Sequence, residues 1–223
     1  MLKSDDLINK VKTYNKFLNP ETLSKAYDFA VKAHEKQKRE EGSPYIIHPI
    51  AVANILTELK LDSATIATGL LHDTIEDTHA TYNTIKEEFG QEVADLVDGV
   101  TKISQFENKA GENSKAENFR KLILATSKDI RVLLVKIADR LHNMRTIEAI
   151  NQKEKKERIA KETMEIYSPL AERMGMNRIR DELEDLSFEI LNPEARELIN
   201  DRLNHIKHKK EMKVYLILFI QLL

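Results

Sequence analysis

The sequence contains no cysteine. This absence excludes disulfide bonds, thiolate metal sites and cysteine nucleophiles, and it suits a reducing compartment, so we expect a cytoplasmic location. Glycine and proline are also scarce, with six and five residues in a chain of 223. The sequence shows no glycine-rich phosphate-binding loop and no pair of strands joined by a hairpin turn. Any metal site or nucleophile must therefore be built without thiols.

Charge of one sign is not in excess either. Lys and Arg total 35 and Asp and Glu total 37, which leaves a formal net charge of −2. This balance gives no general attraction to nucleic acid or to an anionic membrane, so a polyanionic ligand must be met by a local site. Residues 1–16 alternate charged and polar side chains and contain no apolar stretch of the kind found in signal peptides.

The sequence ends in an apolar stretch, residues 214–223, directly after the basic run 207–210. A helix that crosses a bilayer needs about 20 apolar residues, roughly twice the length of this stretch, so no membrane span is expected. The stretch is interpreted as an interfacial anchor, as part of a core helix or as the edge of a longer protein. We expect it to offer a surface for a partner or for self-association.

Helical periodicity dominates the remaining sequence. Apolar residues recur at the i, i+3, i+4, i+7 spacing of a buried helix face within residues 52–59, 66–71, 85–97 and 130–141, with Gly90 interrupting the third stripe. Residues 132–135 alone would also suit a buried strand, but the i, i+4 spacing continues through Leu141 and favours a helix. The pattern predicts an all-α fold.

Breaks in the periodicity suggest how the chain is organised. Loops are predicted at residues 39–45 and 107–115. A third break is predicted at Ser168-Pro169, followed by Gly175, before a charged helix at 178–191. We predict a main domain at residues 1–165, a helical extension at 166–200 and a basic and apolar tail at 201–223.

One segment, residues 69–78, places several ionisable side chains at the end of an apolar helix. At 3.6 residues per turn, His72 shares a face with Glu76, and Asp73 shares one with Asp77. Three carboxylates so close together repel one another unless positive charge lies among them, and a divalent cation would supply it. A solvated polar helix terminus explains the segment equally well.

His72 and Asp73 can bind the same metal ion only in a particular local geometry. Adjacent residues diverge by about 100° around a helix, so both can reach one ion only near a helix end or bend, with other ligands arriving from elsewhere. His48 is a candidate for such a ligand. It precedes Pro49, which suits position N1 of a helix.

Asp139 is a second candidate ligand from elsewhere in the chain. It interrupts an otherwise apolar helix, which is costly unless the carboxylate binds a cation or pairs within the helix with Arg140 or Arg145. Asn143 and Thr146 lie on the same helix face, at i+4 and i+7. The spacing leaves both interpretations of Asp139 open.

Together, His48, the doublet His72-Asp73 and the distant Asp139 resemble the H…HD…D metal pattern of the HD phosphohydrolase superfamily. The narrower resemblance is to the hydrolase domain of RelA/SpoT-type (Rel) alarmone enzymes. Its segments run in family order and comprise residues 44–49, 69–78, 89–90, 97–102, 117–121, 136–146 and 167–171. The resemblance implies an HD-domain helical bundle with a C-terminal helical extension.

The resemblance also implies an activity. Enzymes of this kind remove the 3′-pyrophosphate of guanosine 3′,5′-bis(diphosphate) (ppGpp) or of the pentaphosphate, releasing GDP or GTP and pyrophosphate, with a metal-activated water as the nucleophile. The implied cation is manganese, held by His48, His72, Asp73 and Asp139. By their chemistry alone, two imidazoles and two carboxylates would also accept zinc, iron, cobalt or nickel.

Further roles follow from the resemblance. Glu76 and Asp77 would be the catalytic pair that orients the water and moves protons. Arg39 stands where the family has an arginine that packs on the guanine base, and a planar guanidinium stacks well on an aromatic ring. By spacing alone, Arg39 is better explained as a surface charge. Asn143 and Thr146 would contact the nucleotide.

The chain also departs from the family pattern. Glu40 and Glu41 follow Arg39, where the family usually has a basic or small residue, and they would weaken substrate binding if they pointed inward. Glu172 stands where the family commonly has a histidine, outside the metal set. Nothing here resembles a synthetase domain, so alarmone synthesis is not expected, and the chain is interpreted as a stand-alone hydrolase or as the front of a split gene.

Two alternative functions stay open. The first is an HD phosphohydrolase that acts on another nucleotide, because nucleotide specificity rests on few residues. The second is a regulatory remnant that binds metal and nucleotide without turnover. The presence of both Glu76 and Asp77 argues against the remnant.

Overall fold

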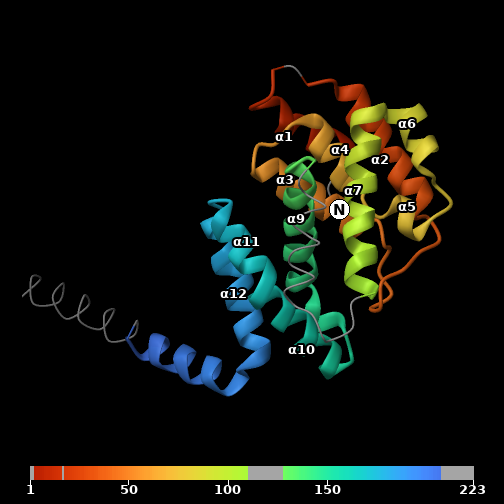
Figure 1. Ribbon diagram of the computed structural model, residues 1–223. Coiled ribbons are helices and arrows are strands. Elements are labelled where there is room, and N and C mark those ends of the chain that lie inside the picture. The colour runs from red at the N-terminus through yellow and green to blue at the C-terminus, as the bar shows by residue number, and fades with distance from the viewer. Residues whose placement is uncertain (1–2, 17, 110–127, 207–223) are drawn as a thin grey trace, which may run out of the picture. The chain divides into compact units, whose positions relative to one another are not determined.

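The computed structural model describes residues 3–16, 18–109 and 128–206 (Figure 1). Regular secondary structure in these ranges is helical, which confirms the predicted all-α class, and the one isolated β-bridge joins Lys38 to Pro44. Every helix within these ranges is too short or too polar to cross a membrane. The predicted apolar tail, residues 214–223, lies outside the described residues.

The chain divides into two compact units, Met1–Asn151 and Gln152–Leu223. The domain boundary at residue 165 stays a prediction. The helices of the first unit are α1 (Ser4–Lys12), α2 (Pro20–Ala33), α3 (Ile47–Glu58), α4 (Ser63–Leu71), α5 (Thr74–Asp77), α6 (Tyr82–Phe89), α7 (Gln91–Lys109), α9 (Arg131–Arg145) and the short 3-10 helix η1 (Ile147–Ala149). All the candidate site residues belong to this unit.

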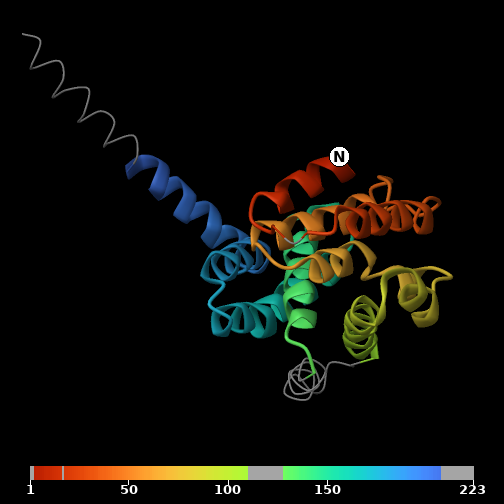
Figure 2. The same ribbon diagram turned by 90° about the horizontal axis from the view of Figure 1, so that it is seen from above.

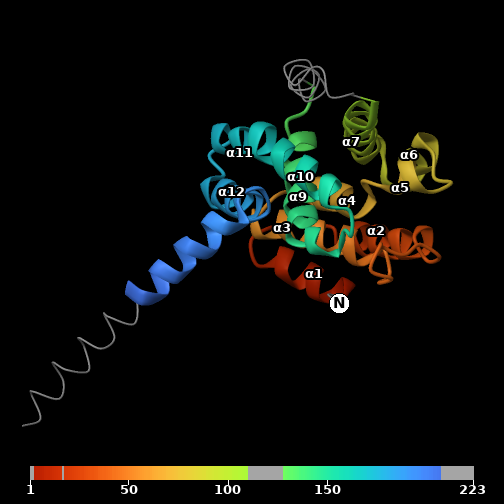
Figure 3. The same ribbon diagram turned by 90° about the horizontal axis from the view of Figure 1, so that it is seen from below.

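Helix α4 lies at the centre of the first unit. It packs against α2, α3, α7 and α9, and its residues from Thr65 to Leu71 are all buried. Helix α9 is also buried on most of its circumference, as expected of a helix without a wide polar face. Helix α1 packs on the outside, against α2 and α3 (Figures 2 and 3).

A glycine allows α3 and α4 to approach closely. A Cβ atom on Gly69 would lie 2.5 Å from Leu56 Cδ1 and 3.3 Å from Ala53 Cα, so no larger residue fits without a shift. The two helices run antiparallel, with His48 in the first turn of α3 and His72 directly after the last residue of α4. Their close packing therefore brings the two imidazoles to the same end of the pair.

Two expectations about helix boundaries in this unit were wrong. The apolar stripe at 85–97 is not one helix, because the chain turns at Gly90, whose φ of +88° ends α6 before α7 begins. Helix α3 begins at Ile47, so Pro49 is its third residue and not N1. The missing N–H of proline costs no helical bond there, because the first four N–H groups of a helix have no partner within it.

The second unit contains α10 (Lys153–Glu162), the π-helix η2 (Thr163–Tyr167), α11 (Ser168–Arg173), α12 (Asn177–Leu191) and a further helix over residues 193–206. The break predicted at Ser168-Pro169 is wrong. The chain stays helical from α10 through η2 into α11, and Pro169 lies in the first turn of α11. The turn comes later, at Gly175, whose φ is +70°.

The two predicted loops compare differently with the structure. Residues 39–45 form a loop that contains Gly42 at a φ of +87°. Of the loop predicted at 107–115, residues 107–109 belong to α7 and the others lie outside the described residues.

Candidate metal centre

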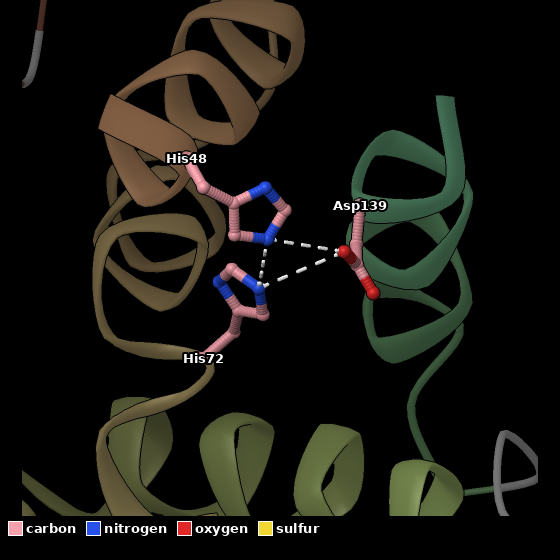
Figure 4. A group of neighbouring side chains, drawn as sticks. All are labelled: His48, His72 and Asp139. Atoms are coloured by element: carbon pink, nitrogen blue, oxygen red, sulfur yellow. Dashed lines mark hydrogen bonds and ion pairs between the residues drawn. The ribbon is translucent and has the colours of Figure 1, made fainter. Parts of the chain in front are cut away.

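Three side chains converge in the core of the first unit, from α3, from the bend after α4 and from α9 (Figure 4). Nε2 of His48 lies 3.3 Å from Nε2 of His72 and 3.2 Å from Oδ1 of Asp139. Nε2 of His72 lies 3.9 Å from the same Asp139 oxygen. All three residues are buried, and their ligand atoms are grouped closely enough to share one ion.

Asp73 adds a second carboxylate to this group. Its Oδ2 lies 3.1 Å from Nε2 of His72 and 3.5 Å from Nε2 of His48. Helix α4 ends at Leu71 and α5 begins at Thr74, so His72 and Asp73 lie in a bend between two helices. The bend lets adjacent residues point at one place, which a continuous helix does not allow.

Hydrogen bonds orient both imidazole rings. The carbonyl oxygen of Gly69 lies 2.8 Å from Nδ1 of His72, and because a carbonyl only accepts, Nδ1 carries the proton. Nδ1 of His48 lies 2.8 Å from Nδ1 of His142. Burial, with the positive charge of His48, lowers the pKa of His142 to about 3, so His142 is neutral and its Nδ1 accepts from His48. Nε2 of each ligand candidate is then left for the ion.

The charges of the group depend on one another. Burial by itself lowers the pKa of His72, but the negative charges of Asp73 and Asp139 outweigh it and raise that pKa to about 9. Burial by itself raises the pKa of Asp73 and Asp139, but nearby positive charge outweighs it. His72 holds the pKa of Asp73 below its usual range, and Lys136 with His48 does the same for Asp139. Two ionised carboxylates therefore face a position that favours positive charge.

The ligand atoms of His48, His72 and Asp139 are spaced to fit one divalent transition metal ion. Ligand atoms about 2.0–2.2 Å from one ion lie about 3.0–3.5 Å from their neighbours in octahedral or tetrahedral arrangements. The separations among these three ligand atoms, from 3.2 to 3.9 Å, are close to this range. Two imidazole nitrogens with two carboxylate oxygens suit manganese, iron, cobalt, nickel or zinc.

Glu76 and Asp77 lie beside the group, on the short helix α5. The Tyr45 hydroxyl donates to Oδ2 of Asp73 at 2.7 Å and is 3.2 Å from Oδ2 of Asp77, so this phenol joins a candidate ligand to a candidate catalytic residue. Burial, followed by the negative charge of Asp73, raises the pKa of Glu76 and of Asp77. Both carboxyl groups are therefore more basic than an exposed carboxylate.

Two of the predicted nucleotide-binding residues are linked to the group. The Asn143 amide donates to Oδ1 of Asp139 at 2.7 Å, and Nη2 of Arg39 donates to Oδ1 of Asn143 at 3.3 Å. Nη1 of Arg39 is buried and has no hydrogen-bond partner among the described residues. The Thr146 hydroxyl instead donates to the carbonyl oxygen of His142, at the end of α9.

Of Glu40 and Glu41, which depart from the family pattern, Glu41 lies near Arg39. Oε1 of Glu41 is 4.0 Å from Nε of Arg39 and accepts a hydrogen bond from the Ser43 hydroxyl at 2.6 Å. Its carboxylate therefore lies beside the guanidinium, and it offsets part of the positive charge that a phosphorylated ligand would meet.

Sequence reasoning missed three residues that contact this group: Tyr45, Lys136 and His142. The signals for two of them were local, since Tyr45 stands three residues before His48 and Lys136 stands three before Asp139. Asp139 forms an ion pair with Lys136, whose Nζ lies 3.0 Å from Oδ2 of Asp139. Nothing in the local sequence marked His142 as a partner of His48, 94 residues away.

Comparison with known proteins places the chain in a family. Residues 26–177 match the family described as HD domain. A protein of Aquifex aeolicus named guanosine-3′,5′-bis(diphosphate) 3′-pyrophosphohydrolase is 51% identical over 197 residues, which cover 88% of this chain and 27% of the relative. The bifunctional (p)ppGpp synthase/hydrolase SpoT of Escherichia coli is 50% identical over 191 residues, which cover 85% of this chain and 27% of the relative.

The similarity extends to the solved structures. One described as a metazoan ortholog of SpoT that hydrolyzes ppGpp superposes with a TM-score of 0.57 at 24% identity, covering 81% of this chain and 98% of that one. This likeness concerns the fold. The chain spans 27% of the length of the two curated relatives. These matches confirm the resemblance to RelA/SpoT-type enzymes, and the chain belongs to the HD domain family.

Proposed function

We propose that this chain hydrolyses the 3′-pyrophosphate of ppGpp, or of the pentaphosphate, to GDP or GTP and pyrophosphate. The observation that carries the proposal is the convergence of two imidazoles and two carboxylates beside Glu76 and Asp77, with Arg39 and Asn143 linked to the same group. The similarity to the Aquifex pyrophosphohydrolase supports this choice of substrate. The reaction would take place in the cytoplasm.

In this proposal His48, His72, Asp73 and Asp139 hold one divalent cation, and manganese is the preferred ion. A cation held there would lower the pKa of a water molecule and polarise a phosphate oxygen. The protein supplies the geometry, because the bend before α5, the Gly69 carbonyl and the His142 imidazole fix how the ligand atoms point.

Glu76 and Asp77 move the protons. Their raised pKa values make them better bases than exposed carboxylates. One of them accepts a proton as the water oxygen bonds to phosphorus. The bond from that phosphorus to the 3′-oxygen of the ribose then breaks, and the 3′-oxygen takes up a proton.

Arg39, Asn143 and Thr146 bind the nucleotide in this proposal. The Arg39 guanidinium is mostly buried, with its side chain 18% exposed, and the Asn143 amide holds it at one edge. A planar cation fixed in this way can stack on guanine. Because Asn143 also donates to Asp139, nucleotide and cation would lie on the two sides of one amide.

The test uses the purified chain with ppGpp and Mn²⁺, with EDTA as the metal-free control. We expect GDP and pyrophosphate in equal amounts, and none with EDTA. Glu76→Gln should keep the cation and lower kcat by about 10²–10⁴-fold, the usual contribution of general acid–base catalysis. Glu87→Gln, at an exposed position on α6, is the matched control and should keep full activity.

Two results would contradict the proposal. A folded parent chain that leaves ppGpp intact while it cleaves another nucleotide from a panel would reassign the substrate. If the folded chain binds Mn²⁺ and ppGpp without turnover, it is a regulatory protein and not a hydrolase.

A further inference from the structure

Lys136 is a buried lysine whose position neither the metal set nor the catalytic pair explains. It lies on α9, one turn before Asp139, and the residue is 4% exposed. Lysine is seldom so buried unless its ammonium group is paired. Nζ of Lys136 donates to Oδ2 of Asp139 at 3.0 Å and to the Ser104 hydroxyl at 3.3 Å.

The two oxygens of Asp139 have different partners. Oδ1 faces Nε2 of His48 at 3.2 Å and accepts the Asn143 amide at 2.7 Å. Oδ2 is turned away from the imidazoles and bonds to Lys136. A rotation of the carboxylate would break contacts at both oxygens, so Lys136 and Asn143 together fix which oxygen faces the ion.

The ammonium group also ties α9 to the neighbouring helix. Ser104 belongs to α7, which packs against both α9 and α5. The same hydroxyl hydrogen-bonds to the Glu76 side chain. Lys136 and Ser104 therefore form a bridge between the candidate ligand Asp139 and the candidate catalytic Glu76.

We propose that Lys136 is a positioning residue, which holds Oδ2 of Asp139 so that Oδ1 alone faces the metal. The inference rests on the proposed metal site, but it does not depend on which nucleotide is the substrate. The ammonium group has no free electron pair to bind a cation, and it touches a ligand and not the reacting atoms. Its effect should therefore appear in metal binding itself.

A purely structural role for Lys136 makes a different prediction. If the ion pair only stabilises the buried helix, a variant without it unfolds more easily, but its folded molecules bind metal as the parent does. If Lys136 positions Asp139, the folded variant binds metal more weakly and with altered geometry. Metal affinity, measured on folded protein, separates the two.

The experiment titrates the metal-free chain with Mn²⁺ and follows free Mn²⁺ by electron paramagnetic resonance. We expect Lys136→Met to raise the Kd about 10–100-fold, the usual effect of losing a partner of a metal ligand. Lys136→Arg keeps a charged donor and should recover part of the loss. The visible spectrum of bound Co²⁺ should differ between Lys136→Met and the parent, because the carboxylate can then turn.

Lys102→Met is the matched control. It removes a lysine of α7 whose side chain is 58% exposed and pairs with Asp98, so it should leave the Kd unchanged. If Lys136→Met does not fold, Lys136→Gln, which keeps a neutral donor, replaces it in the same titration. Parent-like Mn²⁺ affinity in the folded variant, no recovery with arginine, or an equal loss in Lys102→Met would overturn the proposal.

The result is independent of the proposed function. If the parent chain binds Mn²⁺ but leaves ppGpp intact, the proposed substrate is wrong, and the Lys136 titration still tests the role of Lys136. If the parent chain cleaves ppGpp and Lys136→Met binds Mn²⁺ as tightly as the parent, only the proposed role of Lys136 is wrong.

Discussion

The close approach of α3 and α4 at Gly69 makes a sharp prediction about the metal centre. Adding one methyl group, by Gly69→Ala, places a Cβ atom 2.5 Å from Leu56 Cδ1 and 3.3 Å from Ala53 Cα. Carbon atoms in contact are about 3.5–4.0 Å apart, so about 1 Å of overlap must be relieved. Leu56 is fully buried and has little room to turn. We therefore expect the two helices to separate.

The effect on the ligands follows from their present distance. The two Nε2 atoms of His48 and His72 are 3.3 Å apart. If the helices take up the whole overlap, this separation grows to about 4.3 Å, while two atoms bound to one ion at about 2.1 Å are at most about 4.2 Å apart. Even partial separation distorts the site, so the Kd for Mn²⁺ should rise at least tenfold.

The effect on stability is smaller. Alanine is better than glycine in a helix by about 1 kcal/mol, whereas overpacking costs about 1–3 kcal/mol. The net loss is about 1 kcal/mol, which lowers the melting temperature Tm of a chain this long by about 2–4 °C. The predicted signature is thus a large loss of metal affinity with a small loss of stability.

The assay compares Mn²⁺ titrations and thermal unfolding of Gly69→Ala with those of Ile8→Val. The control removes one methyl group from a buried residue of α1, at a similar cost of about 0.5–1.5 kcal/mol, and touches none of the candidate ligands. Its Mn²⁺ affinity should equal that of the parent. If Gly69→Ala also binds Mn²⁺ within twofold of the parent, the close packing does not position the imidazoles and the reasoning is refuted.

Three further predictions concern the same group. Asp73→Ala should remove both the cation and the activity, and a full complement of metal by elemental analysis would exclude Asp73 as a ligand. Tyr45→Phe should raise the Kd for Mn²⁺ and lower kcat about tenfold or more, because Asp73 and Asp77 both lose the phenol that orients them; an unchanged Kd and kcat would show that these hydrogen bonds are dispensable. In the metal-free protein the pKa of His72 is raised from 6.5 to about 9, so the proton on His72 stabilises the fold fully below pH 6.5, and this contribution is lost as the pH rises through about 9. With EDTA present, the urea concentration at the unfolding midpoint should therefore decrease as the pH rises from about 6.5 to about 9.5. The Mn²⁺ affinity should rise over the same pH window, because the ion displaces that proton. A urea midpoint that does not change with pH would contradict the charge on His72.

Several features could be read from the sequence because they depend on neighbours along the chain. The spacing of apolar residues predicted the helical class, since one buried face repeats every 3.6 residues whatever the helix packs against. The doublet His72-Asp73 and the isolated Asp139 stood out because charged groups are costly within apolar stretches. The order of the motifs indicated the HD family, which the match over residues 26–177 confirms.

Local signals were weaker at the ends of helices. Gly90 interrupts an apolar stripe that continues on both sides of it, and only its backbone angle showed that two helices meet there. At Ser168-Pro169 the proline suggested a break, but a π-helix carries the chain into a new helical turn where proline is tolerated. Both outcomes depend on how the helices pack against the rest of their unit.

The arrangement of the candidate site was decided by tertiary structure alone. The sequence by itself determined which residue types were available, and it required His72 and Asp73 to lie at a bend. It did not determine that His142 would support His48, that Lys136 would take one oxygen of Asp139, or that Gly69 would let two helices bring the imidazoles together. These contacts join residues up to 94 positions apart, and their geometry depends on packing, which no local pattern encodes.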